Sequence, residues 1–171
     1  MDDEKPHIYE YQYSPQHKKA IFVEKYRIRD ARKEPGVINE KHVENVDDLE
    51  GAASYKRRLY VVTSHSLTKK GKAKKKRELL LEVGKFEESA EGEFIAHVSN
   101  AASLTNAIQK SLAGLTKRKA KLIETRRRWN IGGFAIDRWG TAYIGFTNPL
   151  TEMDNQIYAI VLSAKLEHFL S

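Results

Sequence analysis

The chain has 171 residues, of which 40 % are hydrophobic and 31 % are charged, and it contains no cysteine. This balance is typical of a globular protein and argues against intrinsic disorder. Without cysteine, neither a disulfide nor a thiolate metal site can form. No stretch approaches the roughly 20 apolar residues of a membrane span, and the acidic start at residues 1–5 is unlike a signal peptide. We therefore expect a cytoplasmic protein with one core.

The net charge of +7 comes from two basic segments. Lys69–Arg77 holds seven basic residues and no acid, and Lys117–Arg128 holds seven more against Glu124. The rest of the chain is net acidic. The basicity is therefore a property of these two segments and does not characterise the whole fold.

Alternating apolar and polar residues, rich in β-branched and aromatic side chains, predict a mostly β chain. Residues 1–19 are polar with alternating tyrosines, which is typical of an edge strand or an arm. Strands are predicted near residues 21–28, 52–54, 59–63, 78–83, 94–98, 133–136, 142–146 and 157–162. Asp30–Asn45 contains Pro35-Gly36 and many charges, so we expect a loop or a short hairpin there.

One segment, Ser99–Leu115, predicts a helix. Its apolar residues recur near helical spacing at Ala102, Leu104, Ile108 and Leu112. Asn100 and Ser103 are both suitable caps for its start, and Gly114 is suitable for its end.

Two stretches, Asp47–Ser66 and Asn130–Pro149, are built alike. The aligned residues are Gly51 with Gly133, Ala53 with Ala135, Tyr60 with Tyr143 and His65 with Asn148. Only one inserted residue separates the two patterns, although glycine, alanine and a two-strand turn are also common in unrelated hairpins. We expect two equivalent hairpins with Glu50 and Gly132 at matching corners.

Over roughly residues 47–162 the chain resembles a bacterial family, the domain of unknown function numbered 3616, whose members look like β-propellers. The motifs that carry the resemblance are Asp48-Leu49-Glu50-Gly51-Ala52-Ala53, Ser64-His65-Ser66, Asn130-Ile131-Gly132-Gly133 and Tyr143-Ile144-Gly145-Phe146-Thr147-Asn148-Pro149-Leu150. Two positions depart from the family pattern: Gly132 stands where the family has glutamate, and Thr147 where it has arginine.

The resemblance implies a mainly β fold with one helix, built as a partial β-propeller-like stack of antiparallel hairpins. A six-bladed propeller needs roughly 240 residues, so this chain has material for about half a ring. Residues 1–19 would form a polar N-terminal arm and residues 20–171 a single propeller-like domain. The chain would then be a short or truncated member of the family.

Equivalent turns of a propeller gather at one end of its channel, so repeated polar positions are expected to meet there. The candidate ligand-binding residues are Asp48, Glu50, His65 and Asn148, with Asp47 beside them. Carboxylate and amide oxygens suit a divalent cation such as calcium, and a histidine near a carboxylate suits acid–base chemistry. Alternatively, these residues only cap turns and close a strand.

Related propeller enzymes hydrolyse phosphoesters or lactones, so the resemblance implies an esterase-like activity that is weak or absent here. The sequence has no Gly-x-Ser-x-Gly elbow and no glycine-rich phosphate loop. No catalytic residue can be assigned, and a structural remnant without activity is a further alternative.

The basic run offers a second function, which is nucleic-acid binding through phosphates. Its residues are Lys69, Lys70, Lys72, Lys74, Lys75, Lys76 and Arg77. No aromatic residue interrupts the run, so a solvated hairpin loop between two strands explains it equally well. Arg126-Arg127-Arg128-Trp129 places an indole beside three guanidinium groups and is a further candidate.

The strand predicted at residues 157–162 is apolar on both faces. Such a strand expects cover on both sides, and about half a ring leaves open sheet edges. We therefore expect the chain to self-associate through this strand or to be only marginally stable.

Overall fold

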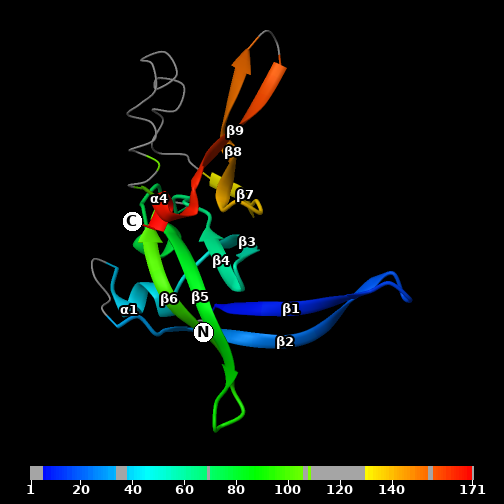
Figure 1. Ribbon diagram of the computed structural model, residues 1–171. Coiled ribbons are helices and arrows are strands. Elements are labelled where there is room, and N and C mark those ends of the chain that lie inside the picture. Colours follow the sequence, from blue (N-terminus) through cyan, green and yellow to red (C-terminus); the bar gives the residue numbers. More distant parts are fainter. Residues whose placement is uncertain are drawn as a thin grey trace.

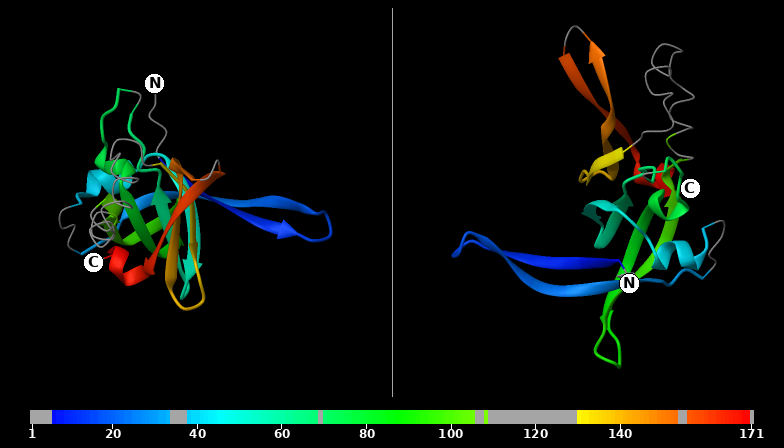
Figure 2. Two further views of the ribbon diagram at one scale, coloured as in Figure 1. Left: turned by 90° about the horizontal axis from the view of Figure 1, so that it is seen from above. Right: turned by 180° about the vertical axis from the view of Figure 1, so that it is seen from behind.

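The computed structural model of the chain describes residues 6–33, 38–68, 70–105, 108, 130–153 and 156–170. They form a mainly β fold of two sheets with short helices, as the sequence predicts (Figure 1). The larger sheet curls like half of a barrel, and the smaller sheet packs beside its end strand β3 (Figure 2).

Six strands form the larger sheet, in the order β1-β2-β6-β5-β4-β3. Their bounds are His7–Ser14 (β1), Lys19–Asp30 (β2), Leu49–Tyr55 (β3), Arg58–Thr63 (β4), Leu79–Glu88 (β5) and Phe94–Ser103 (β6). Neighbouring strands are antiparallel except β2 and β6, which pair in parallel. This parallel pair departs from the expected stack of antiparallel hairpins, because the chain makes β3, β4 and β5 before β6 returns beside β2.

The smaller sheet has the order β7-β8-β9 and is antiparallel. Its strands are Asn130–Ile136 (β7), Thr141–Met153 (β8) and Gln156–Lys165 (β9). Within the described residues β9 pairs only with β8, and Val161 on it is 58 % exposed. Self-association through residues 157–162 stays a prediction that this open edge permits.

The short helices are α1 (Glu40–Glu44), the single 3-10 turn η1 (Lys75–Arg77) and α4 (Leu166–Leu170). The prediction of a loop or hairpin over Asp30–Asn45 is wrong for its second half, because α1 lies there. The Asn39 side-chain oxygen accepts the N–H of His42 at 3.1 Å and so caps this helix. Val43 then packs its fully buried side chain against the larger sheet.

The helix expected over Ser99–Leu115 begins later than predicted. Ser99–Ser103 belongs to β6, because β5 supplies it with a strand partner as far as Leu79 opposite Ser103. Asn100 is therefore a strand residue and not a cap. Helical backbone begins at Leu104, while Leu112, Gly114 and residues 126–129 lie outside the described residues.

The two repeated stretches form hairpins of the same register, as predicted. The matched pairs are Ala53 opposite Tyr60 and Ala135 opposite Tyr143. Each hairpin carries one extra, bulged residue on its first strand, directly before the glycine. The bulged residues are Glu50 in β3 and Gly132 in β7, so a single hairpin design is used twice.

The hairpins touch where β3 runs beside β7. A Cβ added at Gly51 would lie 2.8 Å from the Cβ of Phe134, which is closer than real side chains approach. A Cβ added at Gly133, the counterpart of Gly51, would meet no atom within 4 Å. Glycine is therefore required for close packing at the first position and not at the second.

We expect Gly51→Ala to lower the free energy of unfolding by about 1–3 kcal/mol, because overpacking forces the two hairpins apart. Gly133→Ala is the matched control and should cost less than about 1 kcal/mol, since its methyl group enters open space. Urea unfolding midpoints measure both. Equal losses for the two variants would show that β3 and β7 do not meet as described.

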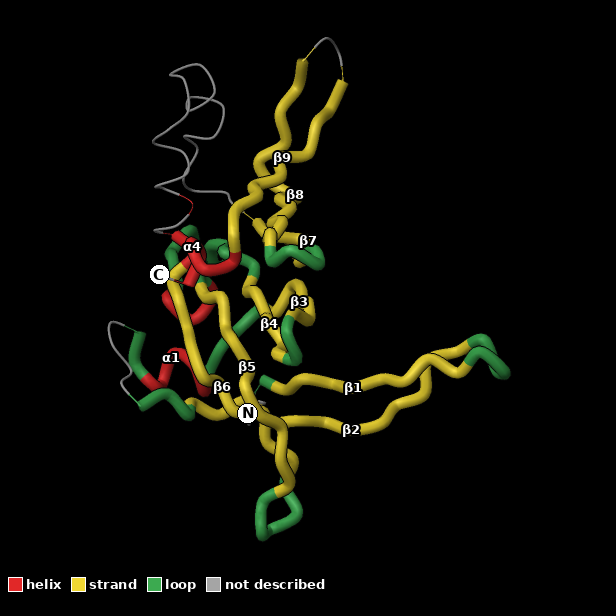
Figure 3. Tube along the Cα trace, viewed as in Figure 1, coloured by secondary structure: helices red, strands yellow, loops and turns green. Residues whose placement is uncertain are grey.

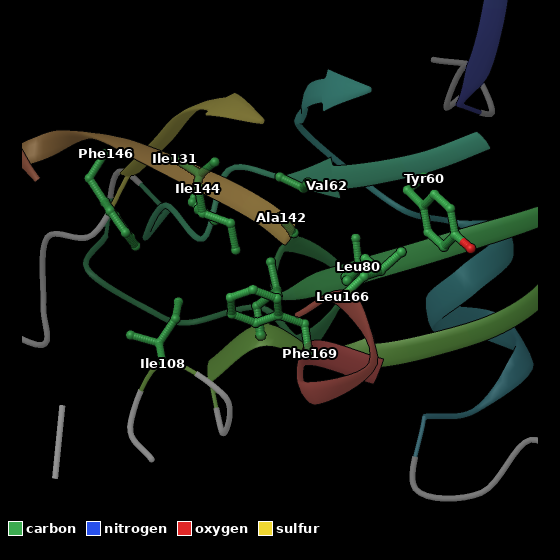
Figure 4. Packing of buried hydrophobic residues seen from close by; sticks show 11 residues of the cluster. Tyr60, Val62, Leu80, Ile108, Ile131, Ala142, Ile144, Phe146, Leu166 and Phe169 are labelled. Carbon is green, nitrogen blue, oxygen red and sulfur yellow. The ribbon is translucent and has the colours of Figure 1, made fainter. Parts of the chain in front are cut away.

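The main core lies between the sheets and is closed by α4 (Figure 4). Its buried members are Tyr60, Val62, Leu80, Leu104, Ile108, Ile131, Ala142, Ile144, Phe146, Leu166 and Phe169. A second core fills the space between the larger sheet and α1. Its buried members are Ile28, Val43, Val46, Val61, Leu79, Leu81, Val83, Ala96 and Val98. Strand β4 supplies both cores from opposite faces and so links them.

Candidate functional site

Two of the predicted residues, Asp48 and His65, lie just beyond the ends of β3 and β4, with Ser64 and Ser66 on either side of His65. One carboxylate oxygen of Asp48 accepts the hydroxyl of Ser64 at 2.5 Å and the hydroxyl of Ser66 at 2.7 Å. The backbone N–H of Ser64 also donates to the carbonyl of Asp48, at 2.9 Å. We call this group, with Asp47, His65 and Arg77, the Asp48–His65 junction.

Two residues of the junction have left-handed backbone. The φ angles are 65° at Asp48 and 59° at His65, and each such non-glycine residue costs of order 1–3 kcal/mol. Hydrogen bonds hold both in place: the N–H of His65 donates to the carbonyl of Arg77 at 2.7 Å. Left-handed non-glycine residues cluster at functional sites, but Lys18, Lys56 and Arg57 have the same backbone in turns outside the junction.

The His65 side chain is buried, with 7 % of its surface exposed. Neither ring nitrogen makes a well-formed hydrogen bond within the part of the chain that the structure describes. Burial lowers the pKa of His65 to about 4, and the backbone of Thr63 opposes this shift only in part. The imidazole is therefore neutral at pH 7 and has one N–H donor and one nitrogen acceptor, neither of them in a well-formed hydrogen bond among the described residues.

The acids of the junction are neutralised by the basic loop. Arg77 donates to Asp47 at 3.0 Å and lies 3.2 Å from an oxygen of Asp48. Lys74 and Lys76 each approach Asp47 to 3.7 Å. Burial alone would raise the pKa of Asp47, but the hydrogen bond and charge of Arg77, with the two lysines, hold it below its ordinary value.

These ion pairs already occupy the carboxylates that a cation at the junction would need. Among the described residues no group of three or more His, Asp or Glu side chains is arranged to hold a metal ion. Bound calcium would have to displace Arg77 and the lysines from the carboxylates that it needs.

Glu50 lies apart from the junction's hydrogen-bond network. It is the exposed bulged residue of β3, and the described residues give it no hydrogen bond or ion pair. Its pKa is raised by burial and, to a smaller extent, by the charge of Asp48. Glu50 is therefore near Asp48 without sharing its partners.

The second repeated stretch reaches the junction through its backbone. The N–H of Ile131 donates to the carbonyl of Ser64 at 2.7 Å. Asn130, the residue before Ile131, lies opposite Asn148 in the strand pair of β7 and β8. The amide oxygen of Asn130 is buried without a hydrogen-bond partner among the described residues. The side chain of Asn148 lies outside the described part, so the structure places only its backbone near the site.

The hydroxyl groups of the junction are not arranged for nucleophilic catalysis. Ser64 and Ser66 donate to Asp48, and no hydrogen bond joins either hydroxyl to His65. A serine nucleophile needs a neighbouring base within hydrogen-bond reach. The geometry fits hydrogen-bond recognition better than ester hydrolysis.

Only some residues of the basic run 69–77 form ion pairs with the acids of the junction. Lys74, Lys76 and Arg77 lie against Asp47 and Asp48, as described above. Lys70, Lys72 and Lys75 are exposed, and Lys69 lies outside the described residues. About half of the charges predicted for a nucleic-acid site are therefore committed to the junction.

A pocket of about 370 Å³ lies on the larger sheet, and the sequence does not point to it. Its lining residues are Ala31, Arg58, Gly84, Lys85, Glu87, His97 and Ser99. Glu87 is paired with His97 at 2.6 Å and also with Lys85, while Arg58 is paired with the buried Glu82. Lys85 and Arg58 are thus each paired with a carboxylate, and we assign the cavity no function.

Only strand pairing brings these cavity residues together. Irregular pairing of β5 with β6 around Val83 turns Lys85 opposite His97. The available sequence signal was the alternation of charges along Glu82, Lys85 and Glu87, which also fits an ordinary exposed strand face.

Comparison with protein-family models, with curated proteins and with solved structures gives no match. No helix in the described ranges is both long and apolar enough to cross a membrane.

Proposed function

We propose that the chain is a propeller-like binding domain, related to the family it resembles, and that the Asp48–His65 junction binds a small polar ligand. The observation that carries this proposal is the buried, neutral His65, whose ring nitrogens make no well-formed hydrogen bond among the described residues. An unsatisfied buried polar group costs about 1–3 kcal/mol, and such groups in native proteins ask for an explanation. A ligand that accepts from one nitrogen and donates to the other would remove this cost.

The charge of the junction narrows the class of ligand. Two carboxylates face one guanidinium group and two ammonium groups, so the cluster favours a neutral or anionic molecule over a cation. Phosphoesters and lactones fit this description and are the first compounds to test. Because the His65 ring is buried, a ligand can reach it only if neighbouring residues move aside.

The test is a thermal-shift screen of the full chain against phosphoesters, lactones and divalent metal salts. A true ligand at about 100 times its dissociation constant stabilises a protein by roughly 2.7 kcal/mol. We expect a phosphoester or lactone to stabilise the wild type, and His65→Asn to lose that shift, since asparagine tolerates the left-handed backbone. Gln12→Thr, remote from the junction, is the control variant and should keep the shift.

Three outcomes would contradict this function. Stabilisation by calcium or magnesium that requires Asp48 would restore the cation interpretation. The same shift in wild type and His65→Asn would move the ligand to another site. No shift with any compound would favour a purely structural role, as in a remnant without activity. Nucleic-acid binding through Lys70, Lys72 and Lys75 is the weaker alternative, because half of the run already neutralises Asp47 and Asp48.

A further inference from the structure

The hairpin of β1 and β2 extends away from the body of the molecule as an arm (Figures 1 and 3). Strand β2 joins the sheet only from Arg27 onward, where it pairs with β6. Before Arg27 its described partner is β1 alone. A two-stranded hairpin is marginal in water without a third strand or a packed face. Contact with another molecule would therefore stabilise this arm.

One face of the arm is aromatic and exposed. We define the aromatic face as Tyr9, Tyr11, Tyr13, Phe22 and Lys25, which the pairing register places on the same side. The four rings are 52 %, 58 %, 63 % and 51 % exposed, respectively. Tyr11 and Phe22 make an edge-to-face contact with centroids 5.8 Å apart. Apolar exposure of this extent on a protein surface marks an interaction site.

The charges of the arm are segregated. Lys25 lies over the Tyr9 ring, 5.6 Å from its centroid, and Tyr11–Val23 contains Lys18 and Lys19 but no acid. The two acidic residues of the arm, Glu10 and Glu24, lie opposite each other in the strand register, on the other face. The aromatic face and the tip are therefore positive, which suits a polyanion and repels a second copy of the same face.

The tyrosines of β1 are spaced at a distance that suits stacked bases. Alternate residues of a strand are about 6.6–6.8 Å apart, roughly twice the 3.4 Å separation of stacked bases. One base therefore fits between neighbouring tyrosines. We propose that the aromatic face of the arm binds single-stranded nucleic acid, with bases stacked on Tyr9, Tyr11 and Tyr13 and phosphates held by Lys25 and by Lys18 at the tip.

This inference is independent of the Asp48–His65 junction and of the basic loop. Exposed rings prefer unpaired bases, because stacked bases inside a duplex offer no free face. The surface does not read sequence, since it presents rings and ammonium groups without a matching set of hydrogen-bond donors and acceptors.

The test is fluorescence anisotropy of labelled 12-nucleotide oligo(U) and oligo(dT) with the full chain. We expect binding of both at low salt, weakened between about 50 and 200 mM as phosphate contacts are lost. The variant Tyr11→Thr/Tyr13→Thr should bind at least about fivefold more weakly for each ring removed. The matched control Gln12→Thr/Ile21→Thr changes the opposite face and should bind like the wild type.

Tyr13→Thr alone guards against misfolding, because this residue is the most exposed of the four rings and lies nearest the turn; it should still weaken binding about fivefold. Several results would overturn the inference: no binding by the wild type, equal affinity of the wild type and the tyrosine variants, or equal loss in the control. Tighter binding of a duplex, or loss of binding in Lys70→Ala/Lys72→Ala/Lys75→Ala alone, would do the same. Light scattering that shows a dimer dissociated by Tyr11→Thr/Tyr13→Thr would assign the face to a second copy instead.

Discussion

Phe169→Ala is expected to lower the free energy of unfolding by about 3–5 kcal/mol, the loss typical of a large aromatic side chain removed from a core. Phe169 is 2 % exposed and lies in the main core. Figure 4 shows its ring between residues of both sheets, with Leu80 and Ile144 nearby. Its removal leaves a cavity at the point where the two sheets are held together, so the loss exceeds that of a side chain within one sheet.

Phe86→Ala is the matched control, because Phe86 is 42 % exposed on β5. It should cost about 1 kcal/mol or less, largely through its edge-to-face contact with Tyr26. Chemical denaturation followed by circular dichroism measures both variants. A typical domain has only about 5–15 kcal/mol of stability, so Phe169→Ala should come close to unfolding the chain. Similar losses for the two variants would mean that α4 does not close the core.

The stability of the protein should fall as the pH is lowered from 6.5 to 4, because of His65. Burial lowers the pKa of His65 from 6.5 to about 4 in the folded state. Between these values the unfolded chain binds a proton that the folded chain does not, so the free energy of unfolding decreases as the pH falls. The full contribution is present above pH 6.5, and the loss amounts to about 3 kcal/mol by pH 4.

His65→Asn isolates this effect, since asparagine does not titrate. Urea unfolding at pH 7, 5.5 and 4 should show the wild type losing about 3 kcal/mol more than the variant over this range. The lowered pKa values of Asp30 and Asp47 add stability at neutral pH, and this stability is lost as the pH falls below about 4, equally in the wild type and the variant. If the free energy of unfolding changed with pH equally in the wild type and the variant, the folded protein would bind the His65 proton as readily as the unfolded chain, and the expected low pKa would be wrong.

The sequence predicted the strands well, because each strand has one buried face and alternation shows it directly. Strand β4 is an example: Tyr60 and Val62 enter one core while Val61 enters the other. The repeated hairpin was also visible, since Gly51 has to be a glycine and the aligned tyrosines share one register. The missed features depend on distant pairing. Residues 99–103 have helical spacing, but β5 offered them a strand partner.

The candidate site was predicted in part. Asp48 precedes β3 and the Ser64-His65-Ser66 motif follows β4. They meet because these two strands form one hairpin, which brings its open ends side by side. The role of Arg77 was not foreseen, because it was counted among the charges of a basic run. Sequence proximity to six lysines concealed that its guanidinium group turns inward to Asp47 and Asp48.

The parallel pairing of β2 with β6 has a consequence for the order of folding. Arg27 pairs with Ile95, so the two strands meet only after β3, β4 and β5 have been made and the chain has turned back. Antiparallel neighbours such as β4 and β5 join through nearby loops and lose less chain entropy on meeting. The meander from β3 to β6 is thus the part that can assemble early. Strands β1 and β2 come first in the chain but can join the sheet only after β6 has formed. During that interval the tyrosines of β1 stand in water on a hairpin without a sheet, where chaperone contact or aggregation competes with folding.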